Sequence, residues 1–162
     1  MFVLLTAAQL ASPAAVGANS SPEVPEAAVL LSEIEASGPK AVLGRLWANE
    51  SQFNAVCDRI EAGDPTWLEV ARRLRPASDA AASLSLNYSV ARALPAAPGR
   101  VLGLVGHGFT IQDICTSPFI EPEPGVAESY EARALRALST LRGTQLSGLA
   151  EQCAARIRLP VR

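Results

Sequence analysis

Side chains that could carry out chemistry are few in this sequence. It has one histidine, His107, and three cysteines, Cys57, Cys115 and Cys153. A thiol nucleophile needs a base such as histidine beside it, and a structural zinc site needs about four Cys or His ligands, usually with short spacings between them. The sequence has no second histidine and no CxxC spacing. It therefore predicts no metal site and no cofactor, and we expect His107 to sit at the C-terminal end of a helix that Gly108 terminates.

The three cysteines differ in their surroundings. Cys57 shares a helical face with Phe53, Val56 and Ile60, which predicts a buried and inert thiol. Cys115 precedes an irregular loop and Cys153 falls on the apolar face of the last helix, so a Cys115–Cys153 disulfide would tie that loop down. Three free thiols in a reducing compartment are the alternative.

Carboxylates occur in close pairs at three places. The pairs are Glu33 with Glu35, Glu121 with Glu123, and Glu128 with Glu131. The first two spacings direct the side chains apart on a helix or place them along an extended loop, and the third suits a helix N-terminus. None has the aromatic surroundings of a glycosidase site. We expect a protein that is not an enzyme, although a cell-envelope hydrolase remains an alternative.

The segment from Ser117 to Gly125 contains three prolines, two glutamates and the apolar pair Phe119 and Ile120. Its prolines favour extended backbone. In one interpretation Phe119, Ile120, Glu121 and Glu123 form a binding site for another protein. In the other, Phe119 and Ile120 pack into the core and the loop is structural.

The elements that must position these residues are short helices with clear boundaries. Asp64-Pro65 and Ser78-Asp79 have the features of helix N-termini, and Asn49 is expected to cap a third helix. Connections as short as Gly38-Pro39 and Gly63-Asp64 predict antiparallel or sharply angled neighbours. The fold class is therefore all-α, an irregular bundle or short α-solenoid of antiparallel helix pairs. Helices are expected over residues 25–36, 40–48, 50–62, 65–75, 79–94, 98–106, 110–115, 125–142 and 145–158.

Composition and the N-terminal segment bear on size and location. The 162 residues are 49% hydrophobic and 19% charged with a net charge of −2, which fits one domain and gives no basic patch for nucleic acid.

The N-terminal segment bears on location: Phe2–Ala11 is apolar, and Val16-Gly17-Ala18 matches a signal-peptidase site. We expect a signal peptide over 1–18, a single domain over 19–162 and a periplasmic or secreted protein. The alternative is a core helix at 2–10. The apolar run is too short to span a membrane.

Packing and capping residues recur in a definite order along about half of the chain: Leu46-Trp47, Phe53, Ile60, Gly63 to Leu68, Ala71, Leu74, Ser78-Asp79, Ala91, Leu94-Pro95 and Ile114-Cys115. This order resembles that of uncharacterised exported, HEAT-like helical proteins of proteobacteria. It implies a periplasmic helical protein and no catalytic residue. Together with the absence of reactive groups it predicts a helical interaction module that binds another protein and is itself a monomer or weak homo-oligomer. An immunity-type inhibitor of a toxin is the alternative.

Overall fold

The computed structural model describes residues 24–158, so the expected signal peptide lies outside the described residues. Within that range the protein is all-helical, without a β-strand and with an isolated bridge between Val105 and Phe109. The elements are α1 (Ala27–Ser37), α2 (Pro39–Trp47), α3 (Glu50–Glu61), α4 (Pro65–Leu74), the 3-10 helix η1 (Arg75–Ala77), α5 (Ala80–Ala93), α6 (Pro98–Leu102), α7 (Ile111–Ile114), α8 (Val126–Ser139) and α9 (Ser147–Ile157).

Side-chain caps begin the central helices, as the sequence predicts. The Asn49 carboxamide oxygen accepts from the Gln52 N–H at the start of α3, and Asp79 accepts from Ala82 N–H at the start of α5. Asp64 caps α4 by accepting from the next two free N–H groups, with proline at the first helical position. Each cap satisfies donors that a helix N-terminus would leave without a partner.

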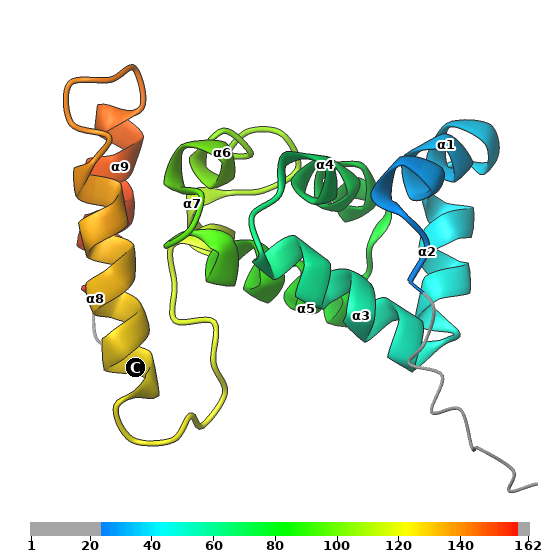
Figure 1. The fold of residues 1–162 in the computed structure, drawn as a ribbon, viewed down its shortest axis with the longest axis horizontal. Helices are drawn as coiled ribbons and strands as arrows, with labels where there is room; N and C mark the ends of the chain where they lie inside the picture. Colours follow the sequence, from blue (N-terminus) through cyan, green and yellow to red (C-terminus); the bar gives the residue numbers. More distant parts are fainter. Residues whose placement is uncertain (1–23, 159–162) are drawn as a thin grey trace, which may run out of the picture.

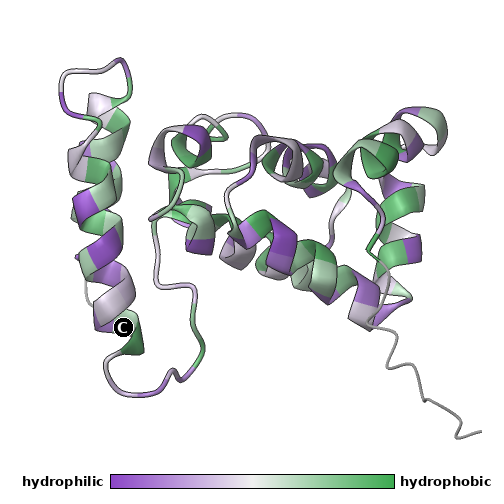
Figure 2. Ribbon diagram, viewed as in Figure 1, coloured by the Kyte–Doolittle hydropathy of each residue, from purple (hydrophilic) through white to green (hydrophobic). Residues whose placement is uncertain are grey.

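The helices pack into a body and a terminal hairpin (Figure 1). In the body α3 lies along α5, α1 packs against both α2 and α4, and α7 packs against α5. The antiparallel pair α8 and α9 forms the terminal hairpin, which lies at the end of the molecule opposite to α1 and α2 and contacts the body through α6 and α7. Apolar and polar residues alternate along the long helices in Figure 2, as expected for amphipathic elements. The buried apolar side chains form one continuous core that includes residues of both parts.

The helix expected over 98–106 is shorter than its apolar pattern indicates. It ends at Leu102, with Gly103 as its cap, and the chain then turns. Gly106 has a φ of +84°, and its N–H donates to the Phe109 carbonyl, which closes the turn. The expectation that His107 ends a helix is therefore wrong, because His107 lies exposed in this turn.

A polar network fixes α7, the short helix that leads into the irregular loop. Thr110 and Asp113 form a reciprocal capping box at its first turn. The Asn87 side chain on α5 donates to Asp113 over 2.9 Å and accepts from Arg75 over 2.9 Å. These partly buried bonds hold α7 on α5, and so set the position of Cys115 directly after it.

Candidate functional site

The predicted disulfide is present and stands at the base of the irregular loop. Cys115 and Cys153 are bonded, with their Cα atoms 5.1 Å apart, and both residues are fully buried. The bond connects the end of α7 to the middle of α9. Residues 116–125, the loop that runs from this bond to α8, are drawn in yellow in Figure 1.

Arg92 of α5 holds the first half of this loop. Its guanidinium donates to the carbonyl of buried Pro118 over 2.9 Å and pairs with Glu61 over 2.6 Å. The same guanidinium carbon lies 5.4 Å from the centre of the Phe119 ring, a cation–π distance. The backbone and the aromatic side chain of this segment therefore share one anchor.

Phe119 also packs edge-on against Tyr130 of α8. The ring centroids are 5.5 Å apart with an interplanar angle of 84°. The Tyr130 hydroxyl donates to the Ala91 carbonyl over 2.8 Å, and burial raises the pKa of this phenol above its usual value. The prediction that Phe119 packs toward the core is thus partly met, since its side chain is partly buried against the core cluster.

Ile120 does not follow Phe119 inward. Its side chain is 72% exposed, so the expectation that both residues pack into the core is wrong for Ile120. Neighbouring residues of an extended chain point in opposite directions, and Phe119 occupies the site on Tyr130. Glu121 then adopts a φ of +47°, in the left-handed region, and the chain bends there. Ile120, Glu121, Pro122 and Glu123 are all exposed, and we call this segment the acidic tip.

The remaining reactive candidates lie apart from one another. Cys57 is free and buried beside a cavity of about 220 Å³ between α3 and α5. Burial raises the pKa of its thiol to about 11, so the thiol stays protonated at neutral pH. His107 is not among the residues that line this cavity, and the other two cysteines are bonded to each other. Within residues 24–158 no group of three or more His, Cys, Asp or Glu is placed to hold a metal ion.

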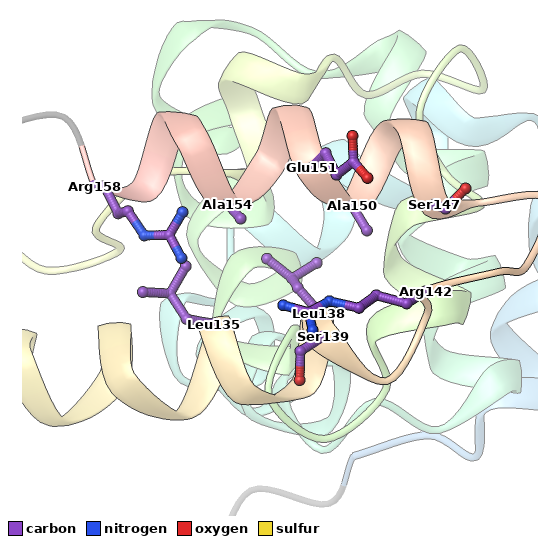
Figure 3. Close-up of a pocket in the computed structure, with 9 residues that line it drawn as sticks. All are labelled: Leu135, Leu138, Ser139, Arg142, Ser147, Ala150, Glu151, Ala154 and Arg158. Carbon is purple, nitrogen blue, oxygen red and sulfur yellow. The ribbon is translucent and has the colours of Figure 1, made fainter.

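A groove between α8 and α9 is the feature that sequence reasoning missed (Figure 3). It has a volume of about 220 Å³, and we call it the α8–α9 groove. Facing residues on two helices form it, and no local spacing indicates such a pairing. Its lining residues are Leu135, Leu138, Ser139, Arg142, Ser147, Ala150, Glu151, Ala154 and Arg158.

Comparison with protein-family models, with curated proteins and with solved structures found no match to this chain. In the described range no helix has the length and apolar character that crossing a bilayer requires.

Proposed function

We propose that this protein is an exported helical module that binds another protein through the acidic tip, Ile120–Glu123. The observation that carries the proposal is the contrast within one loop. Residues up to Phe119 are held by a disulfide, an arginine and an aromatic contact, whereas Ile120 directly after them is 72% exposed. A large apolar side chain on a fixed base is suited to fill an apolar pocket on a partner.

The base of the loop makes such an anchor effective. Binding costs less free energy when the binding segment is already ordered, because less conformational entropy is lost. Pro122 and Pro124 restrict the backbone after Ile120, and Gly125 with a φ of +86° starts α8 directly afterwards. We infer that the acidic tip keeps nearly the same conformation when free and when bound.

The chemistry of the tip indicates the chemistry of its partner. Neither Glu121 nor Glu123 has an ion-pair partner within the described residues. A partner surface with an apolar pocket bordered by arginine or lysine would complement one exposed isoleucine between two carboxylates. Such an interface forms faster at low ionic strength, because the opposite charges attract over about one Debye length.

Location belongs to the same proposal. The apolar N-terminal segment and its small-residue cleavage site support export, and a disulfide persists best in an oxidising compartment such as the periplasm. The resemblance to exported HEAT-like proteins points the same way. We further propose that the antiparallel helix pairs form a short, irregular solenoid. Mass spectrometry of the native protein should find Asn19 at its N-terminus, and a dominant intact form beginning at Met1 would contradict export.

Affinity capture from a periplasmic extract tests the binding element. The wild type is compared with the triple variant Ile120→Ser, Glu121→Lys, Glu123→Lys and with His107→Ala. We expect the triple variant to recover about tenfold less of the bound protein, and His107→Ala to recover it within a few-fold of the wild type.

A matched control changes the same residue types elsewhere. Val29 is 50% exposed on α1, Glu35 is exposed on the same helix, and exposed Glu26 is the residue that precedes it. The variant Val29→Ser, Glu26→Lys, Glu35→Lys should capture the partner as well as the wild type does. If the tip variant also retains full capture, the loop is structural and the proposal fails.

A further inference from the structure

The α8–α9 groove combines an apolar floor with two arginines. Leu135 and Leu138 come from α8 and Ala150 and Ala154 from α9, so apolar side chains of both helices line the space between them. Arg142 follows α8 and Arg158 caps the end of α9. Neither arginine has a carboxylate partner within residues 24–158.

Both arginines extend over this floor in Figure 3. The Arg142 side chain reaches toward Leu138 and the Arg158 side chain reaches toward Leu135, whereas the Glu151 carboxylate is turned away from α8. The hairpin as a whole is cationic in a protein whose net charge is −2, because residues 126–158 contain five arginines and three glutamates. The groove therefore favours an acidic segment that also carries an apolar side chain.

We propose that the α8–α9 groove receives the acidic tip of a second copy of this chain, so that protomers associate head to tail. This inference rests on the proposed function, in which the tip is the binding element, and it names the partner. The tip supplies one exposed isoleucine and two carboxylates that have no ion-pair partner. The groove supplies the apolar floor and two guanidinium groups, which bind carboxylates with directional hydrogen bonds.

The tip of the same chain lies at the opposite end of α8 from the Arg142 side of the groove. Phe119 is held against Tyr130 near the start of α8, and the loop re-enters that helix at Gly125. Arg142 lies beyond the opposite end of α8, whose 14 residues span about 21 Å at 1.5 Å per residue. In Figure 3 the body of the protein lies behind the hairpin, so the groove is open to an approaching molecule.

Such a contact joins two different surfaces. A head-to-tail contact leaves one free tip and one free groove at the ends of every assembly that has not closed into a ring, so further copies can add there. A short segment in a small groove also buries little surface, and interfaces below about 1,200 Å² are usually weak. The association should therefore be concentration-dependent and sensitive to salt.

Sedimentation velocity of the full chain tests the inference, over roughly 10 µM to 1 mM, where such weak interfaces dissociate. Two variants that lack the charges without reversing them are compared. The tip variant is Glu121→Gln, Glu123→Gln and the groove variant is Arg142→Gln, Arg158→Gln. We expect the wild-type average mass to rise with concentration and fall with added salt, and each variant to associate about tenfold more weakly.

Mixing the two variants gives the decisive result. The groove variant keeps a native tip and the tip variant keeps a native groove, so one native contact per pair remains. The mixture should form a one-to-one pair with wild-type affinity and nothing larger. Circular dichroism and the thermal midpoint of each variant confirm that the changes have left the fold intact.

Two results would overturn self-assembly. One is a wild type that stays monomeric at about 1 mM, far above the dissociation constant of a functional weak contact. The other is association that both variants retain unchanged, which would place the contact on a different face. Tip-dependent capture of a different protein alongside a monomeric wild type would still support the proposed function, so the two failures are separable.

Discussion

Removal of the Cys115–Cys153 disulfide should lower the free energy of unfolding by about 4 kcal/mol. The bond closes a segment of 38 residues that contains the acidic tip, all of α8, the whole α8–α9 connection and the first part of α9. In the chain-entropy description, cross-linking ends that far apart costs the unfolded state about 4 kcal/mol of conformational freedom. That is a large part of the roughly 5–15 kcal/mol by which domains of this size are stable.

The double variant Cys115→Ala, Cys153→Ala is the perturbation, and urea denaturation of oxidised wild type and variant is the assay. Cys57→Ala is the matched control, because Cys57 is a buried cysteine that forms no disulfide. Hydrogen exchange should show the largest loss of protection in α9, whose main contacts are with α8 and α7. A loss of less than about 1 kcal/mol, or equal loss in the control, would refute the reasoning, since the unfolded chain would then not be limited by this bond.

Local geometry and burial at four other positions give further expected outcomes, each measured by urea denaturation. Gly63→Ala should lower the free energy of unfolding by about 2 kcal/mol, because φ is +74° and the new Cβ would lie 2.8 Å from the Cβ of Ala97. A decrease of less than about 0.5 kcal/mol would contradict this prediction. Trp67→Ala should lower the free energy of unfolding by about 2 kcal/mol, less than the roughly 3–5 kcal/mol lost for a fully buried aromatic side chain, because Trp67 is only partly buried. An unchanged denaturation midpoint would mean that Trp67 contributes no packing energy. Tyr130→Phe should cost about 1 kcal/mol for one buried hydrogen bond, and no loss would mean that water replaces it. Burial raises the pKa of the Cys57 thiol from 9.0 to about 11, so the folded state holds this proton more tightly and the free energy of unfolding should fall as pH rises through that interval. Cys57→Ala should remove this pH dependence, and a variant with the same pH slope as the wild type would contradict the prediction.

The helices could be predicted because their boundaries depend on residues close in the sequence. Asn49, Asp64 and Asp79 each bind N–H groups no more than three residues ahead, so a short window contains the whole interaction. Where the termination signal was weaker, the boundary was misplaced. The apolar residues after Leu102 continue a helical pattern, yet the chain leaves the helix at Gly103 and closes the turn with a bond from Gly106 to Phe109.

The candidate site depended on contacts that no short window contains. Arg92 reaches Pro118, 26 residues away, and the Tyr130 hydroxyl reaches Ala91, 39 residues away. The loop could be identified as irregular from its prolines, and the disulfide from the different surroundings of the cysteines. The division between partly buried Phe119 and exposed Ile120 required the position of Tyr130.

The groove and the acidic tip belong to one covalently linked unit. Cys115 begins the loop that carries the tip, and Cys153 lies on α9, one wall of the groove. The disulfide, together with the packing of α8 on α9, therefore sets the relation between the two proposed binding surfaces. In a head-to-tail assembly the same rotation and translation repeats at every contact, so this relation determines whether the chain of protomers closes into a ring or stays open. The bond would then contribute to the form of the assembly as well as to the stability of each protomer.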